Sequence, residues 1–211
     1  MKLRRPESCQ KDPNDIPNWK ALNYCFSKVK SGNHCIDAGG HVGSVARILC
    51  NKFNHVHSFE PLFGKYLKQN TADKKNITIY EVGLGFEKQS EKIYIMPTNT
   101  GGSSIVEHKR RDKFQKQSWT ETKIIPIRKL DDYNFKEKID FIKIDVESYE
   151  WHVIRGAEQT LKTHRPLMMV ELMKRYEDKE YTVGRTHTLL MGLGYRLIKQ
   201  FDEDWVYECA G

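Results

Sequence analysis

The sequence predicts an α/β fold built on one mixed, mostly parallel β-sheet of about seven strands. Three observations support this prediction. Apolar, strand-like runs alternate with helical stretches from residue 34 to residue 193, the pattern of a doubly wound sheet. A glycine-rich turn joins the first strand to its helix. The last two apolar runs lie only a few residues apart, which predicts an antiparallel C-terminal hairpin.

The first half of this domain shows three strand patterns and two helical ones. They are a strand at 34–38, a helix at about 43–53, a strand at 55–59, a helix from Pro61 to about Asn70 and a strand at 77–82. Pro61 suits the first helical turn, because proline lacks the N–H that would stay unpaired there. The segment Gly83-Leu84-Gly85 closes the third strand.

The second half continues the alternation and ends in the hairpin. Its expected elements are strands at 91–96, 123–127 and 139–144, a helix at about 149–163, a strand at 167–172, a helix at 186–193 and strands at 195–199 and 205–207. The run at 167–172 is almost wholly apolar, as in a central strand buried on both faces. Residues 107–117 are rich in Lys and Arg and are expected to be an exposed, mobile segment.

Residues 1–33 are predicted to form an N-terminal extension, and residues 34–211 the main domain. A short helix at about 18–30 carries apolar residues at helical spacing. Two interpretations of the extension stay open: it covers one edge of the core, or it is a candidate lid over a functional site.

Composition narrows the protein class without fixing it. No run of about 18 apolar residues is present, so no membrane span is expected. The basic N-terminus lacks the apolar region of a signal peptide, and the five scattered cysteines form no CxxC pair. These features favour a cytoplasmic protein with reduced thiols. A net charge of +7 permits an anionic partner such as nucleic acid but does not require one.

The glycine turn contains Asp37, Gly39, Gly40 and Gly43, all predicted to contact a cofactor. A strand, glycine loop and helix of this kind open nucleotide-type cofactor sites. The turn lacks the Lys-Ser/Thr of a P-loop, and Asp37 replaces the first glycine of the dinucleotide motif. An acid disfavours a diphosphate and favours a cationic group. S-adenosylmethionine, which carries an ammonium and a sulfonium, meets that condition.

Four residues downstream complete the predicted cofactor pocket. Glu60 ends the second strand, where its carboxylate could accept hydrogen bonds from both ribose hydroxyls. Leu62 is placed to pack on an adenine ring, and Gly83 and Leu84 would approach the base from the other side.

A third cluster follows the strand at 139–144. The segment Asp145-Val146-Glu147 brings two carboxylates to the carboxyl end of the sheet, the edge where open α/β folds bind ligands. One could orient the cofactor, and the other could act as a general base or bind substrate. The pair could also hold a divalent cation, although no metal site is predicted. Glu171 ends the next apolar strand, belongs to the same edge and is predicted to bind substrate.

Several motifs in fixed order resemble the FkbM-type methyltransferase family. They are CIDAGGHVGSVA, HSFEP, EVGLG, NTGGSSI, IPIRKLDDY, IDFIKIDVESYEWHVIRGAEQTL and MMVEL, and they span about residues 34–172. The resemblance implies a Rossmann-like class I fold, S-adenosylmethionine as cofactor and O-methylation of a hydroxyl on a sugar, glycan or small natural product.

The resemblance also assigns roles by position. Asp37, Gly39, Gly43 and Glu60 would hold the cofactor, and Asp145 and Glu147 would lie near the transferred methyl group. Asn99, Gly101, Gly102 and Ser103 match a loop that faces cofactor or substrate. One departure is Ser148, where the family commonly has glycine, and a serine restricts the backbone there.

A sugar hydroxyl needs a proton acceptor to become nucleophilic. Glu147 is the first candidate for this general base. The others are Asp145, Glu171, His41, His108 and His152.

Three other functions fit the sequence less well. An RNA ribose 2′-O-methyltransferase, or another nucleic-acid-directed methyltransferase, fits the positive charge and the basic run at 107–117. A non-catalytic binding module would be expected to have lost the glycines or Glu60, and both are present. A dehydrogenase is disfavoured by Asp37. The sequence leaves the acceptor and the oligomeric state open.

Overall fold

The computed structural model describes residues 3–7, 9, 18–97, 99–106, 121–173 and 183–210. Within these residues, seven strands form a twisted main sheet in the order β3-β2-β1-β7-β8-β10-β9. In chain order they are β1 (His34–Ala38), β2 (His55–Phe59), β3 (Ile77–Tyr80), β7 (Ile139–Ile144), β8 (Leu167–Glu171), β9 (Tyr195–Phe201) and β10 (Asp204–Cys209). Pairing is parallel except where β10 meets β8 and β9. The predicted mixed sheet with its C-terminal hairpin is therefore confirmed.

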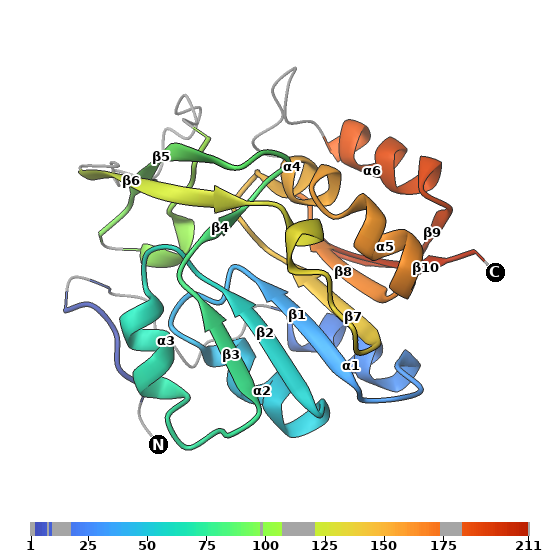
Figure 1. The fold of residues 1–211 in the computed structure, drawn as a ribbon, viewed down its shortest axis with the longest axis horizontal. Helices are drawn as coiled ribbons and strands as arrows, with labels where there is room; N and C mark the ends of the chain where they lie inside the picture. Colours follow the sequence, from blue (N-terminus) through green and yellow to red (C-terminus); the bar gives the residue numbers. More distant parts are fainter. Residues whose placement is uncertain are drawn as a thin grey trace.

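Helices cover both faces of this sheet (Figure 1). On one face lie α1 (Trp19–Lys28) and α2 (Ser44–Lys52), and on the other lie α4 (Glu150–Arg155), α5 (Glu158–His164) and α6 (Val183–Gly192), while α3 (Gly64–Asn70) contacts β3. Alternate strand residues serve the two sides: Cys35 and Phe141 pack toward α1 and α2, and Ile36 and Ile142 pack toward the opposite helices. The buried apolar residues therefore form one hydrophobic cluster on each face of the main sheet, as expected for a parallel sheet covered on both sides.

A second, three-stranded sheet was not predicted. It consists of β4 (Gly83–Leu84), β5 (Gln89–Ile95) and β6 (Glu121–Arg128), with β6 in the middle. The expected strand 77–82 actually ends at Tyr80, and the chain re-pairs at Gly83 with Ile127 of β6. In Figure 1 the arrowheads of β1, β2 and β3 point toward this small sheet, which therefore faces the carboxyl ends of the main strands.

Two predicted helices have different bounds. The helix expected from Pro61 begins at Gly64, because Glu60 accepts the N–H groups of Leu62 and Phe63 before the helix starts. The helix expected at 149–163 is interrupted at Gly156 and Ala157, which separate α4 from α5. Other expected elements agree within a few residues. The basic run at 107–117 lies outside the described residues.

The N-terminal extension contributes to the core through its helix. Ala21, Leu22 and Cys25 of α1 are buried against the sheet, in the cluster that includes Met169 and Val206. The domain boundary at residue 33 and the lid role stay predictions. In the described part of the chain, no helix combines the length and apolar character needed to cross a lipid bilayer.

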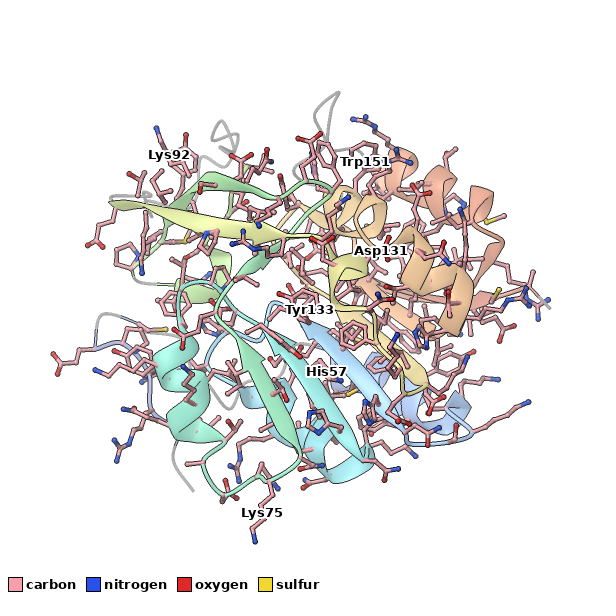
Figure 2. All side chains as sticks on the ribbon, viewed as in Figure 1. His57, Lys75, Lys92, Asp131, Tyr133 and Trp151 are labelled. Atoms are coloured by element: carbon pink, nitrogen blue, oxygen red, sulfur yellow. The ribbon has the colours of Figure 1, made fainter. Side chains whose placement is uncertain are left out.

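Two short 3₁₀ turns complete the described elements, η1 (Thr100–Gly102) and η2 (Leu130–Tyr133). Tyr133 of η2 packs edge-on against Tyr80 at 4.8 Å between ring centroids, and Tyr80 stacks on Phe59 at 4.5 Å. His57, whose ring lies 6.0 Å from that of Tyr80, extends this aromatic cover along the strands (Figure 2). Aromatic side chains thus cover the part of this sheet face that no described helix covers.

The interruption at Gly156 gives a stability test. A methyl group there would lie 1.9 Å from the Gly85 carbonyl oxygen, a backbone atom that cannot rotate away. We expect Gly156→Ala to lower the free energy of unfolding by about 1–3 kcal/mol, the usual cost of overpacking. Gly184→Ala in α6 is the matched control, since a Cβ there meets nothing within 4 Å. This control should be neutral or stabilising by up to about 1 kcal/mol. Equal urea midpoints for Gly156→Ala and wild type would contradict the packing argument.

Candidate functional site

A cavity of about 310 Å³ lies at the carboxyl ends of β1, β2 and β7, where the main sheet meets the small sheet. Its walls come from the glycine loop after β1, the segment after β2, the small sheet, the 99–105 loop, the segment after β7 and the ends of β8 and β9. Carboxyl ends of parallel strands are the expected ligand edge of an open α/β sheet.

The glycine loop is clamped between its two neighbouring strands. The N–H groups of Gly39 and Gly40 both donate to the Phe59 carbonyl oxygen, at 3.0 and 3.1 Å. Gly39 has a φ of +88° and packs so tightly that a Cβ would lie 1.9 Å from the Asp145 carbonyl oxygen. No L-residue with a side chain fits this position, which explains why the loop requires glycine.

Asp37 lies beneath this loop and is outside the cavity lining. Its carboxylate is fully buried, and its Oδ2 accepts a 2.9 Å hydrogen bond from the Ser58 hydroxyl. Its Oδ1 is buried with no hydrogen-bond partner among the described residues. Burial raises the pKa of this carboxyl, although Lys143 and Ser58 oppose the shift. Gly40 and Gly43 are also absent from the lining. For these three residues, direct contact with a ligand stays a prediction.

Glu60 links two segments of the cavity wall through hydrogen bonds to their backbone N–H groups. Its Oε2 accepts the His41 N–H at 2.8 Å, and its Oε1 accepts the N–H groups of Leu62 and Phe63 at 2.7 and 2.9 Å. A carboxylate has about four acceptor positions, so roughly one stays available for a ligand. Burial raises the pKa of Glu60 to about 6, although the three N–H donors oppose the shift. If both ribose hydroxyls contact Glu60, as expected from the sequence, they would both have to donate to that one remaining acceptor position.

The 99–103 loop is tied to the glycine loop and to the N-terminal segment. His41 Nε2 lies 2.8 Å from Thr100 Oγ1, and the Thr100 hydroxyl donates to Cys9 Sγ at 3.3 Å. The Arg4 N–H donates to Asn70, whose side chain also donates to the Val42 carbonyl. The described part of the extension therefore reaches the rim of the cavity, as the lid hypothesis requires.

Carboxylates dominate the opposite end of the cavity. Asp145, Glu147 and Glu171 each place a carboxylate oxygen within 4.8 Å of the others, which makes them the one group in the described chain with metal-binding geometry. Lys143, buried behind them, donates to Asp145 Oδ2 at 2.9 Å. Burial disfavours the charge of Lys143, but Asp145 and Asp37 outweigh it and raise the lysine pKa. Lys143 is thus a fixed positive charge beneath the acids.

The turn after β7 fixes where Glu147 lies. Glu150 Oε1 accepts the N–H groups of Val146 and Ser148, at 3.2 and 3.1 Å. Burial raises the pKa of Glu150 to about 7. The Ser104 hydroxyl donates to the Glu147 carbonyl at 2.5 Å. Glu147 and Ser148 have positive φ values of 55° and 77°, so both adopt the left-handed region.

Most of the predicted site residues do meet in this cavity. Its lining includes Gly39, Glu60, Leu62, Gly83, Leu84, Asn99, Gly101, Gly102, Ser103, Asp145, Glu147 and Glu171. Among the candidate histidines, His41 lines the cavity, His152 lies outside the lining and His108 falls outside the described residues. His152 stacks on Tyr149 at 4.0 Å, and burial lowers its pKa to about 4.

Sequence reasoning missed several lining residues. Ile93 and Ile125 contribute from the small sheet, and Phe63, Tyr149 and Glu203 from loops and the start of α4. Alternation in the strand containing Ile93 carried a signal for one buried face. Nothing local marks Glu203, because it reaches the cavity only through the pairing of β10 with β8.

The left-handed conformation of Ser148 yields a second stability test. A residue with a Cβ costs roughly 1–2 kcal/mol in this region, whereas glycine adopts it freely. We expect Ser148→Gly to raise the free energy of unfolding by about 1 kcal/mol, measured by urea denaturation. Lys129→Gly is the control: Lys129 has a φ of −79°, so glycine there should only destabilise. Destabilisation by Ser148→Gly would show that the serine side chain contributes more than the backbone strain costs.

Comparisons with solved structures agree with this architecture. A methyltransferase FkbM from Methylobacillus flagellatus KT is 18% identical over 84% of this chain and 43% of its own, with a TM-score of 0.54. A precorrin-6y C5,15-methyltransferase from Geobacter metallireducens GS-15 is 12% identical over 98% of this chain and 96% of its own, with a TM-score of 0.51. An rRNA methylase from Streptococcus thermophilus is 10% identical over 90% of this chain and 95% of its own, with a TM-score of 0.50. At these identities the likeness shows a shared methyltransferase fold alone.

The chain spans less than half of the Methylobacillus protein, 43% of its length. No curated protein sequence matches the chain. A family model, however, covers most of it: the one described as the methyltransferase FkbM domain matches residues 37–197. That span contains the glycine loop, Glu60, the acidic cluster and β8. The chain therefore belongs to the methyltransferase FkbM domain family, as its motifs predicted.

Proposed function

We propose that the protein is an S-adenosylmethionine-dependent O-methyltransferase that acts on a hydroxyl of a sugar, glycan or small natural product. The observation that carries this proposal is the composition of one cavity. It joins the glycine loop and Glu60 at one end to Asp145, Glu147 and Glu171 at the other, and its described lining contains no Lys or Arg. Such a lining suits a cofactor that is cationic and carries no phosphate.

The residues present fit S-adenosylmethionine in four respects. Leu62, Phe63 and Leu84 offer apolar surface for an adenine ring, and Glu60 retains roughly one acceptor position for a ribose hydroxyl. The carboxylates at the far end supply negative charge for a sulfonium. The unpartnered Oδ1 of Asp37 supplies a further buried acceptor beneath the glycine loop. When bound, this cofactor supplies an electrophilic methyl group.

The chain's own residues would then position the acceptor. Methyl transfer to oxygen is an in-line displacement, which positioning accelerates strongly. Asn99 and Ser103 in the loop facing the acids offer polar side chains, and Glu147 is held in place by the turn that Glu150 caps. These groups suit an uncharged acceptor with several hydroxyls.

An acidic cavity argues against the nucleic-acid alternative. A ribose 2′-hydroxyl carries flanking phosphates, which would approach Asp145, Glu147, Glu171 and Glu203 with no Lys or Arg in the described lining to receive them. The net charge of +7 is a property of the whole sequence and includes the basic run at 107–117, which lies outside the described residues. The proposal also includes no metal ion, because Lys143 already supplies a positive charge to Asp145.

A calorimetric titration tests the cofactor assignment. S-adenosylmethionine should bind with a dissociation constant of about 1 μM to 1 mM, the usual range for substrates. Glu60→Ala should weaken binding by at least about tenfold, because a hydrogen bond to a charged group contributes about 1.5–3 kcal/mol. Glu208→Ala, which removes an exposed partner of Arg196 on β10, should leave binding unchanged. A wild-type protein that does not bind the cofactor would refute the proposal.

A transfer assay with methyl-labelled cofactor tests the acceptor class. Sugars, glycans, small phenols and RNA should be compared, each with added Mg²⁺ and with a chelator. We expect label in a hydroxylated small molecule or glycan, at equal rates under both metal conditions. Labelling of RNA alone would favour the nucleic-acid alternative, and loss of activity with chelator would show that the acids hold a metal ion.

A further inference from the structure

Asp145 and Glu171 form a carboxyl pair at the edge of the sheet. Ile144 of β7 pairs with Val170 of β8, so the next residue on each strand lies at the same level. The carboxylate oxygens of Asp145 and Glu171 lie within 4.8 Å of each other. Two carboxylates this close repel each other when both are ionised, so a proton on one of them stabilises the pair. The geometry therefore favours a pair that carries one proton.

Lys143 and burial determine which of the two carboxyl groups carries the proton. Burial opposes the ionised form of Asp145, but the charge and hydrogen bond of Lys143, together with Glu171 and His41, outweigh it and lower the pKa of that carboxyl. The pKa of Glu171 shifts in the opposite direction, because burial and the charges of Asp145 and Glu147 raise it well above the usual range. The other Glu171 oxygen, Oε2, is buried with no hydrogen-bond partner among the described residues.

Further charged groups face the pair from every neighbouring element. Asp204 lies opposite Glu171 in the β10 register, and Lys143, Asp145, Glu171 and Asp204 all line a void of about 10 Å³, roughly the size of one water. The remaining groups around the pair are Asp37 on β1, His41 in the glycine loop, Glu147 after β7, Glu150 at the start of α4 and Glu203 beside β10. Within the described residues, Lys143 is the fixed cation amid these acids.

We propose that Asp145 and Glu171 act as one proton-exchanging pair. The number of protons that the pair holds depends on whether the cofactor sulfur is positively charged. The pair keeps its shared proton while no cation lies in the cavity. It releases that proton when a sulfonium binds, and then receives the proton of the acceptor hydroxyl as the methyl group moves. Glu171 is therefore the general base, and Lys143 is a positioning residue that keeps Asp145 ionised. This inference rests on the proposed function.

The charges of this cycle balance. A nearby positive charge favours the ionised form of a carboxyl, so the doubly ionised pair is stabilised beside a sulfonium. During transfer the bond between carbon and the acceptor oxygen forms and the bond between carbon and sulfur breaks. The sulfonium becomes a neutral thioether, and the hydroxyl proton passes to Glu171. The pair and the sulfur together carry a net charge of one negative unit before and after the step, so little charge has to be created in a buried site.

Proton counting in a calorimeter tests this cycle without measuring activity. S-adenosylmethionine and S-adenosylhomocysteine should each be titrated at pH 7.5 in two buffers of different ionisation enthalpy. The two ligands share their ammonium and carboxylate groups and differ in the methyl group and the sulfur charge. We expect proton release with the sulfonium ligand to exceed that with the thioether, and Glu171→Gln to abolish the excess. Glu208→Gln, on the exposed side of β10, should preserve it.

The outcomes separate this inference from the proposed function. Equal proton release by both ligands, or an excess that persists in Glu171→Gln, would overturn the inference while leaving cofactor binding intact. If neither ligand binds the wild-type protein, the proposed function fails and the inference fails with it. Binding of S-adenosylhomocysteine to Glu171→Gln shows that this near-isosteric variant is folded.

The pH profile of methyl transfer supplies a second readout. In the wild type, the rate should rise with pH as the pair loses its proton. Glu171→Gln should be about 10²–10⁴-fold slower, the usual contribution of a general base, and should lack that rise. Lys143→Met removes the positive charge, so the rise should move to higher pH. An unshifted profile in Lys143→Met would contradict the role assigned to the lysine.

Discussion

The contact between Lys143 and Asp145 is the constraint on which the site depends. Parallel strands bring their carboxyl ends together, and in this chain β1, β7 and β8 carry Asp37, Asp145 and Glu171 to that edge. Buried carboxylates repel one another unless a cation or a proton separates them. Lys143 supplies the cation at 2.9 Å from Asp145, and burial favours a proton on Glu171, whose carboxylate oxygen lies within 4.8 Å of that of Asp145. The fold thus gathers carboxylates at one edge of the sheet, where they attract a cationic ligand.

The small sheet and Glu60 turn this charged edge into a cavity. β4, β5 and β6 close the side above the carboxyl ends and contribute Leu84, Ile93 and Ile125 to its apolar wall. Glu60 joins the glycine loop to the segment before α3 through three backbone N–H groups. One end is therefore largely apolar with Glu60 as its carboxylate, while the other end carries a cluster of acids, and a ligand with an aromatic ring and a positive charge matches both ends.

Local sequence patterns predicted the main sheet because its strands are short apolar runs bounded by glycines and acids. They also placed Glu60, Asp145 and Glu171, since strand-end residues of parallel strands must meet. Long-range pairing was not visible: the small sheet depends on Gly83 meeting Ile127. The break at Gly156 likewise depends on the Gly85 carbonyl, and Glu203 enters the cavity only through the β10–β8 pairing.

The central claim is that an acidic cavity selects a cationic cofactor over a phosphate-bearing nucleotide. Competition binding tests it most directly, with labelled S-adenosylmethionine displaced by unlabelled cofactor, NAD or ATP. The account predicts saturable binding that excess unlabelled S-adenosylmethionine abolishes and that NAD and ATP leave unchanged. Displacement by NAD or ATP at concentrations comparable to those of the unlabelled cofactor would contradict it.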